Sequence, residues 1–213
     1  LDLSGGNDQT EYMSETVNIL CPLSWAYTPL NTKVSNTRQM FSEWAISKYG
    51  TAEERFTRYE LDGRKNWWYV CVVPHYPYAN LFGNYQGVLT RVLLWQQFDY
   101  SIEGILYWSV NYWRSGAEWR DIYNEFECGD GLLIYCGKKY DVYGPIGSLR
   151  LELLRDGIED YQYLCMAREL FGQEKVDEFV ASVTTDIVNY THDYEVLKSA
   201  RDTLGDLIES EIE

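Results

Sequence analysis

Three short apolar runs, each followed by proline or polar residues, predict three buried strands. They are residues 17–21 (VNILC), 68–73 (WYVCVV) and 104–109 (GILYWS). These runs are rich in β-branched and aromatic residues, which favour strands. Pro22 and Pro74 end the first two runs, because proline cannot donate a hydrogen bond to a sheet.

Helical patterns fall between these runs, over residues 36–49 and 85–98. Strands that alternate with helices indicate βαβ units and a parallel sheet. A (β/α)8 barrel needs eight such units and typically about 250 residues. If the three runs are barrel strands, they form only its C-terminal part, and the first strand has an exposed edge.

The last third of the chain is predicted to be helical. Ser148 is a good N-cap for the helix that starts with LRLELLRDGIEDY. A second helix is expected over residues 174–190. Asp193 is expected to cap a third over residues 194–212, which carries apolar residues at helical spacing.

Two stretches fit neither pattern. Residues 110–144 form a long segment of the kind that is usually functional or disordered, and residues 131–135 (GLLIY) within it predict a short strand or hairpin arm. Residues 1–16 are polar, begin with Leu rather than Met and resemble a fragment boundary, not a signal peptide. The expected organisation is this N-terminal segment and one unit over residues 17–213, with terminal helices over 146–212.

Composition and charge narrow the choice of partner. With 46% hydrophobic and 24% charged residues, the chain has the composition of a globular protein. Its net charge of −15 argues against nucleic acid or an anionic membrane as the main partner. No apolar run reaches the ~18 residues of a membrane span.

Cysteine usage and short motifs point to no metal and no cofactor. The five cysteines are odd in number, widely spaced and without a CxxC pair, so neither a disulfide framework nor a zinc site is expected. The sequence also lacks a P-loop and the GxGxxG, GxSxG and HExxH motifs.

Aromatic residues are unusually frequent, with 8 Trp, 19 Tyr and 7 Phe. Such rings first of all fill cores. An excess of Trp and Tyr also suits sugar binding, because a flat ring can cover the C–H face of a pyranose. Both interpretations stay open for any single ring.

The position of an aromatic residue relative to the predicted strands indicates whether it is a candidate for sugar binding. In parallel sheets and barrels the functional site lies at the carboxyl ends of the strands. Those ends are residues 21–27 (CPLSWAY), 74–80 (PHYPYAN) and 109–113 (SVNYW), and all three carry aromatic residues. Two also carry polar side chains suited to hydroxyl or amide recognition. Aromatic and polar residues thus occur together at the strand ends, which predicts a carbohydrate site. Its expected contacts are His75, Tyr76, Tyr78, Asn80, Trp108, Asn111 and Trp113.

Each candidate has a structural alternative. His75 could act as a general base, contact a sugar hydroxyl or simply fix its loop through a backbone carbonyl. Tyr76 and Tyr78 could pack the loop around proline. Trp108, near a strand end, could form the floor of a pocket. His192 lies between predicted helices and is expected to be an exposed linker residue.

Carboxylates need the same scrutiny, because glycoside hydrolysis usually uses two of them flanking the bond. Adjacent pairs occur at residues 53–54, in a charged connection, and 159–160, inside a predicted helix. Neither follows a strand, and an Arg155–Glu159 ion pair is an ordinary helix feature. Asp130 in CGDG is the better candidate for contacting substrate, although Gly-Asp-Gly is also a common turn.

Four ordered blocks resemble a known family. They are NWWYVCVVPHYPYANLF, RVLLWQQFDYSIEGILYWSVNYW, GDGLLIY and SLRLELLRDGIEDYQYL. Together they are similar to the C-terminal part of glycoside hydrolase family 123, and equally to the related group catalogued as domain of unknown function 4091. The resemblance covers roughly residues 15–210. One departure is YCG at residues 135–137, where the family typically shows YPG.

The resemblance implies a (β/α)8 barrel with a β-sandwich upstream. It implies hydrolysis of β-linked N-acetylgalactosaminides, in which the substrate's acetamide oxygen attacks the anomeric carbon. An Asp holds the acetamide, and an adjacent Glu protonates the leaving oxygen. That pair has no match here, so no catalytic acid is assigned. Residues 74–80 would follow the seventh barrel strand, residues 109–113 the eighth, and the RDGIEDY helix would pack outside.

These observations predict the C-terminal part of a glycosidase barrel that supplies part of a pocket for N-acetylhexosamine-containing glycans. The chain alone is then expected to be inactive. The alternatives are a non-catalytic carbohydrate-binding protein and an uncharacterised domain whose aromatic residues are core. The open edge of the first strand predicts self-association or a partner that carries the rest of the barrel.

Overall fold

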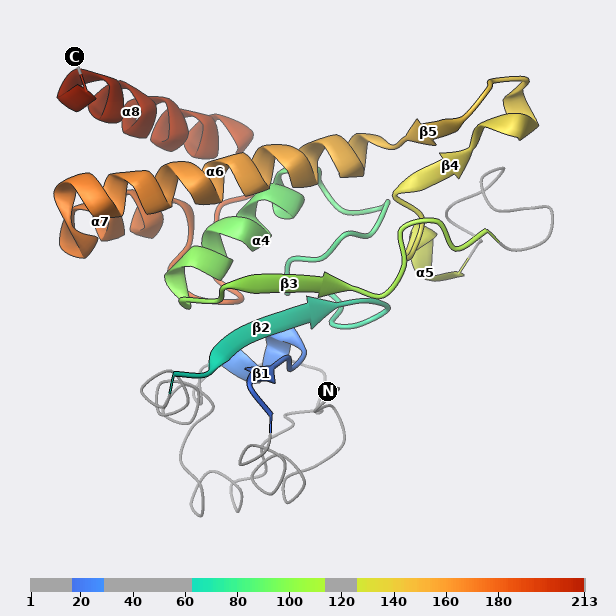
Figure 1. Cartoon of the computed structure of the whole chain (residues 1–213), viewed down its shortest axis with the longest axis horizontal. Coiled ribbons are helices and arrows are strands. Elements are labelled where there is room, and N and C mark those ends of the chain that lie inside the picture. The colour runs from blue at the N-terminus through green and yellow to red at the C-terminus, as the bar shows by residue number, and fades with distance from the viewer. Residues whose placement is uncertain (1–16, 29–62, 114–125, 213) are drawn as a thin grey trace.

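The computed structural model describes residues 17–28, 63–113 and 126–212. It combines a three-stranded sheet, a two-stranded hairpin and a layer of helices (Figure 1). The helix expected over residues 36–49 and the acidic pair at 53–54 lie outside the described residues. The strands are β1 (Ile19–Leu20), β2 (Lys65–Val70), β3 (Gly104–Tyr107), β4 (Ile134–Cys136) and β5 (Pro145–Gly147), and the helices are η1 (Ser24–Tyr27), α4 (Val88–Asp99), α5 (Phe126–Gly129), η2 (Gly137–Tyr140), α6 (Leu149–Phe171), α7 (Gln173–Val183) and α8 (Tyr194–Ile212).

The sheet is parallel, as predicted, with the strands in the order β1-β2-β3. The boundaries of β2 differ from the prediction, because the strand starts three residues earlier and ends at Val70. The apolar run continues to Val73, but there the backbone N–H of Cys71 donates to the carbonyl of Val73 at 2.9 Å, which turns the chain out of the sheet. The third strand likewise ends at Tyr107 rather than at residue 109.

The two faces of β2 have different neighbours. Trp68 and Val70 are fully buried and belong to the same core cluster as the apolar residues of α4. Trp67 points to the opposite face, where it lies over Gly104 of β3, its partner in the strand register. Alternation along a strand therefore puts one set of side chains against the helices and leaves the other set on the face away from α4.

The close approach at Gly104 makes a testable prediction. A methyl group there would lie 2.5 Å from the Trp67 ring, so Gly104→Ala is expected to lower the free energy of unfolding by about 1–3 kcal/mol. In α8, Gly205→Ala is the matched control, because its new Cβ would lie 3.5 Å from Tyr163, an ordinary contact. That change should stabilise by roughly 0.4–1 kcal/mol. Urea unfolding of both variants checks the pair, and equal effects would contradict the packing at Gly104.

Helix α4 occupies the centre of the molecule. It begins at Val88, three residues later than predicted, and nearly all of its residues are buried, polar Arg91, Gln96 and Gln97 included. The sheet lies on one side of it and α6, α7 and α8 lie on the other (Figure 1). A helix covered on all sides is not amphipathic, and most of the surface of α4 is therefore buried.

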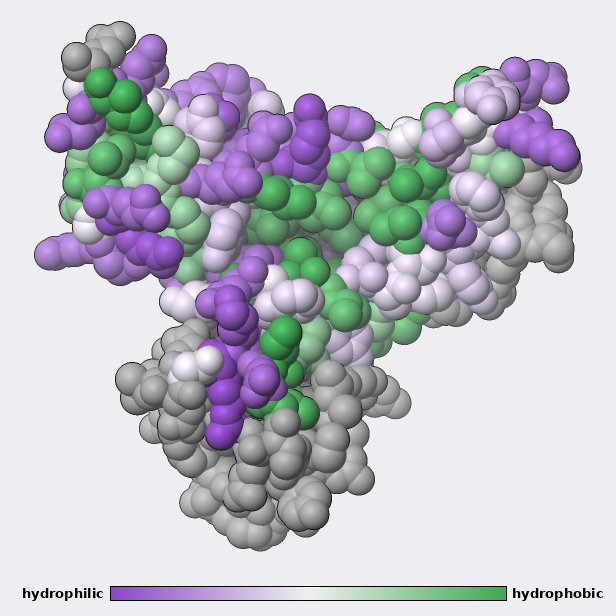
Figure 2. All heavy atoms as spheres, in the orientation of Figure 1, coloured by the Kyte–Doolittle hydropathy of each residue, from purple (hydrophilic) through white to green (hydrophobic). Residues whose placement is uncertain are grey.

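The three C-terminal helices largely follow the prediction. Ser148 caps α6 by accepting a hydrogen bond from the backbone N–H of Leu151, and Asp193 receives one from that of Glu195 at 2.9 Å. Helix α7 ends at Val183, not at residue 190, because the next residues form a turn. In that turn, the Asp186 carboxylate accepts hydrogen bonds from the backbone N–H groups of Val188 and Asn189 at 2.8 Å. Figure 2 shows apolar side chains in the seam beneath α6 and hydrophilic ones on its outer side.

A buried ion pair joins α4 to α6. The Arg91 guanidinium donates from Nε and Nη2 to both oxygens of Asp160, at 2.8 and 2.7 Å, and the indole N–H of Trp95 donates to the same carboxylate at 3.1 Å. The Nε atom of Arg201, in α8, lies 3.6 Å from Asp160 Oδ1. Asp160 is therefore structural, as predicted for the acidic pair at residues 159–160.

The ion pair predicted between Arg155 and Glu159 is wrong. Arg155 instead contacts Glu152 at 3.3 Å and Asp156 at 2.9 Å, and all three side chains lie at the surface. A flexible arginine on a helix surface can reach acidic residues at several spacings. A residue four positions away is therefore not always its partner.

The hairpin formed by β4 and β5 confirms the predicted arm at residues 131–135, although β4 begins three residues later and ends one residue later. It projects away from the helices and the parallel sheet (Figure 1). Tyr143 at its tip is fully exposed. Among residues 17–28, 63–113 and 126–212, no helix is long and apolar enough to cross a bilayer.

Candidate functional site

The segment after β3 folds back on residues that lie 19 to 23 positions further along the chain. The backbone N–H of Tyr112 donates to the carbonyl of Gly131, and that of Leu133 donates to the carbonyl of Val110, both at 2.9 Å. Asn111 and Leu132 form an antiparallel bridge. This pairing brings the loop that contains Asp130 to the carboxyl end of the parallel sheet.

Asp130 and Trp108 form the centre of the candidate site. The Trp108 indole Nε1–H donates to Asp130 Oδ2 at 2.5 Å, and only 1% of Asp130 is exposed. Asp130 Oδ1 is also buried and accepts no hydrogen bond from the described residues. The neighbouring Gly131 has a φ of +76°, and a Cβ there would lie 2.6 Å from the Trp108 ring. Glycine is therefore required for this close approach.

Burial is the main influence on the charge of Asp130. It raises the pKa of the carboxyl above its ordinary value of 3.8, while the Tyr107 hydroxyl, the Trp108 indole and the Arg150 charge act in the opposite direction. Burial and the nearby Asp130 likewise raise the pKa of Tyr107, whose hydroxyl accepts a hydrogen bond from the Gly131 N–H at 2.6 Å. Asp130 is thus a poorly solvated carboxyl whose charge is favoured by the neighbouring Tyr107, Trp108 and Arg150.

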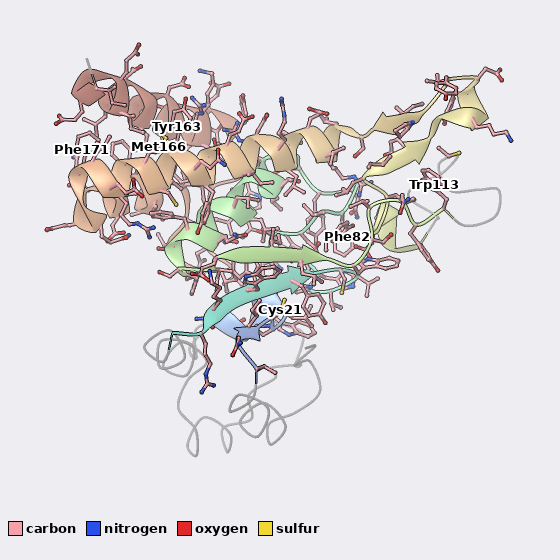
Figure 3. All side chains as sticks on the ribbon, in the orientation of Figure 1. Cys21, Phe82, Trp113, Tyr163, Met166 and Phe171 are labelled. Carbon is pink, nitrogen blue, oxygen red and sulfur yellow. The ribbon has the colours of Figure 1, made fainter. Side chains whose placement is uncertain are left out.

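Two more predicted residues, Asn111 and Trp113, lie in the same segment. Both are exposed, and the Trp113 indole N–H donates to the carbonyl of Ile134 at 2.8 Å. Figure 3 shows Trp113 together with Phe82 on the side of the molecule toward which β2 and β3 run. The structure therefore brings Trp108, Asn111, Trp113 and Asp130 into one region.

The loop after β2 uses two of its predicted site residues internally. The Asn80 side chain is fully buried, donates to the carbonyls of Cys71 and Pro74 at 2.9 Å, and accepts from the Leu81 N–H at 2.7 Å. The Tyr78 ring belongs to the core, and its hydroxyl shares a hydrogen bond of 2.8 Å with Thr28. Both side chains therefore fix the loop, which for Tyr78 is the structural alternative.

His75 and Tyr76 are the exposed members of that loop. The His75 ring stacks on Phe82 with centroids 5.3 Å apart, and 63% of Tyr76 is exposed. The Tyr76 ring lies 6.1 Å from His192, whose Nδ1 is 3.1 Å from Gln86 Oε1. His192 is exposed, as predicted, and it also links the loop between α7 and α8 to the surface beside Tyr76.

Arg150 is a buried residue near the site that the sequence did not single out. Its guanidinium donates to the carbonyls of Leu81, Gly129 and Leu132, at 2.6, 2.9 and 2.6 Å. A cation in the first turn of a helix is unfavourable, because the helix dipole is positive at that end. That unusual placement is the one signal in the sequence that could have revealed it.

No cluster of three or more His, Cys, Asp or Glu side chains that could hold a metal ion occurs among residues 17–28, 63–113 and 126–212. All five cysteines lie in these ranges, and none forms a disulfide.

The fold is similar to that of a family 123 glycoside hydrolase from Clostridium perfringens whose structure concerns glycolipid glycan hydrolysis. The TM-score is 0.63 at 15% sequence identity, over 96% of this chain and 35% of that one. The chain thus spans about a third of the length of that protein, and a likeness at this identity shows the fold alone. No curated protein matches the chain.

A family model adds evidence from the sequence itself. The model described as glycoside hydrolase 123, catalytic domain, matches residues 12–167. This match covers well over half of the chain and includes the loops after β2 and β3 together with Asp130. The resemblance predicted from the four sequence blocks is confirmed, and the chain belongs to the glycoside hydrolase 123 family.

Proposed function

We propose that the chain is the C-terminal part of a (β/α)8 barrel and supplies part of the sugar pocket of a glycoside hydrolase. Family membership supports the reaction class. The parallel order β1-β2-β3, with α4 as the crossover between β2 and β3, supports the barrel, in which consecutive strands are neighbours. The pocket then lies at the carboxyl ends of these strands.

The proposed substrates are N-acetyl-β-hexosaminides, with β-linked N-acetylgalactosamine as the first choice. In the proposed reaction the substrate's acetamide oxygen displaces the leaving group at the anomeric carbon, and an adjacent Asp-Glu pair assists. Among the described residues the acidic pair at 159–160 follows no strand, and its Asp160 is bonded to Arg91. The chain is therefore proposed to bind the sugar, while the acid comes from another part of the protein.

The observation that carries this proposal is the pairing of Asp130 with Trp108. A sugar needs an apolar ring for its C–H face and strong acceptors for its hydroxyls. Trp108 is partly exposed and can offer its ring to the sugar, and the buried Asp130 carboxylate holds that ring by accepting a hydrogen bond from the indole N–H. Hydrogen bonds to a charged acceptor contribute more than those to a neutral one.

The other predicted residues take two roles in the proposal. Asn111, Trp113, His75 and Tyr76 are exposed beside the strand ends and are proposed to contact the sugar or its aglycone. Tyr78 and Asn80 are proposed to act by shaping the loop, because their polar groups are already bonded within the protein.

A non-catalytic carbohydrate-binding protein is the second candidate. This chain has no Asp-Glu pair at a predicted strand end, and an upstream barrel without that pair would favour the second candidate. Self-association, or association with the rest of a barrel, is proposed through β1, which is the edge of the described parallel sheet.

The test compares the full-length protein with this chain in hydrolysis of 4-nitrophenyl N-acetyl-β-galactosaminide. We expect hydrolysis by the full-length protein and none by the chain alone. Sugar binding by the full-length protein without hydrolysis would favour the second candidate. Hydrolysis by the chain alone would contradict the proposed division of roles, and the absence of both binding and hydrolysis would contradict the proposal as a whole.

A further inference from the structure

Arg150 connects two loops that come from different strands. Leu81, which accepts one of its hydrogen bonds, lies in the loop after β2 that also carries His75 and Tyr76. Gly129 and Leu132, which accept two others, lie on either side of Asp130. One guanidinium thus holds both candidate loops to the first turn of α6.

Burial of the Arg150 guanidinium costs desolvation free energy, which its hydrogen bonds must offset. Arg150 is 8% exposed, and no carboxylate of the described residues forms an ion pair with it. A buried cation must have its donors satisfied, and here neutral carbonyls do so. An apolar side chain could fill the same volume without that cost. Nη1 donates to Leu81 and Gly129 and Nη2 donates to Leu132, so the planar guanidinium holds acceptors from both loops in one fixed geometry.

We propose that Arg150 is the positioning residue of the sugar site: it ties the loop after β2 to the loop of Asp130 and so keeps the Asp130 carboxylate beside Trp108. Arg150 touches neither the sugar nor the reacting atoms in this proposal. Its effect on sugar binding rests on the proposed function, whereas its effect on the Asp130–Trp108 pair does not.

Two separable effects follow from the geometry. The first is mechanical, because losing the fork releases the two loops from each other. The second is electrostatic, because the positive charge of Arg150 lowers the pKa of Asp130 against the effect of burial. The other groups that influence this carboxyl are the Tyr107 hydroxyl, the Trp108 indole and the Gly131 N–H. None of these three carries a positive charge, so Arg150 is the cation to remove.

The experiment uses the full-length protein with three substitutions. Arg150→Lys keeps the charge and loses the fork, and Arg150→Met loses both. Arg155→Met is the matched control, because Arg155 lies on the same helix and its ion pairs with Glu152 and Asp156 lie at the surface. The readouts are the dissociation constant for N-acetylgalactosamine and the indole 15N–1H resonance of Trp108 as a function of pH, assigned through Trp108→Phe.

The expected results separate the two effects. Both Arg150 variants should bind the sugar at least about tenfold more weakly, the value of one charge-assisted hydrogen bond. In Arg150→Met the titration midpoint seen at Trp108 should rise by about one pH unit, as expected for loss of a nearby opposite charge. In Arg150→Lys the midpoint should stay near that of the wild type. Arg155→Met should change neither readout.

Unchanged sugar affinity and an unchanged Trp108 titration in Arg150→Lys and Arg150→Met would overturn the inference. If Arg150→Met does not fold, the affinity of Arg150→Lys decides, and a wild-type value overturns the inference. If the wild type binds no sugar, the proposed function fails. A raised Trp108 midpoint in Arg150→Met would then still support the electrostatic effect of Arg150 on Asp130.

Discussion

Replacing Asp160 with alanine is expected to lower the free energy of unfolding by about 3–5 kcal/mol, the usual cost of removing one partner from a buried ion pair. The Arg91 side chain is 8% exposed and that of Asp160 is fully buried. Alanine leaves a desolvated guanidinium without its carboxylate, and it removes the acceptor of the Trp95 indole. Because the network joins α4 to α6, both helices lose an anchor.

Glu159→Ala is the matched control for this prediction. Glu159 is the adjacent acidic residue on the same helix, and it is exposed. Its replacement should change the free energy of unfolding by no more than about 0.5 kcal/mol, as surface substitutions usually do. Urea unfolding of both variants at one pH measures the difference. Similar values for the two would mean that Asp160 does not hold the helices together.

The second large effect is expected in sugar binding. Asp130→Asn should weaken binding of N-acetylgalactosamine to the full-length protein by roughly 10- to 100-fold, because a charge-assisted hydrogen bond contributes about 1.5–3 kcal/mol. Asparagine keeps the size of the side chain and an oxygen that can accept from the Trp108 indole. The variant therefore tests the charge of Asp130 more than the packing around it.

Asp141→Asn serves as the control, since Asp141 is exposed in the hairpin and has a φ of 55°, which asparagine tolerates. Isothermal titration with the sugar gives both dissociation constants. Wild-type affinity in Asp130→Asn would contradict the role of the carboxylate, whereas loss of affinity in both variants would point to a general effect of net charge.

Local patterns identified the elements whose residues interact mainly with sequence neighbours. Helix α8 has the predicted bounds, because its apolar residues recur at helical spacing and Asp193 caps it through a bond two residues away. Ser148 is recognised as a cap for the same reason. The parallel sheet follows from the alternation of apolar runs with helical segments.

The features that the sequence did not reveal depend on distant partners. Asp130 lies beside Trp108 only because the chain folds back between them, 22 residues apart. Arg150 contacts Leu81, which is 69 residues away. The apolar run at residues 68–73 continues past the end of β2, since burial beyond the sheet selects the same residue types as a strand does.

The central position of α4 also bears on how the protein opens. Its amides are covered by the sheet on one side and by α6, α7 and α8 on the other, so solvent reaches them only when one of these layers separates. Amide hydrogen exchange in α4 should thus be among the slowest in the chain and should report a subglobal or global opening. If α4 opens in this way, we expect the strand ends that carry the proposed sugar site to open together with the C-terminal helices. A stop codon or proteolytic cut within α8 is then expected to destabilise the region around Asp130, although the two are far apart along the chain.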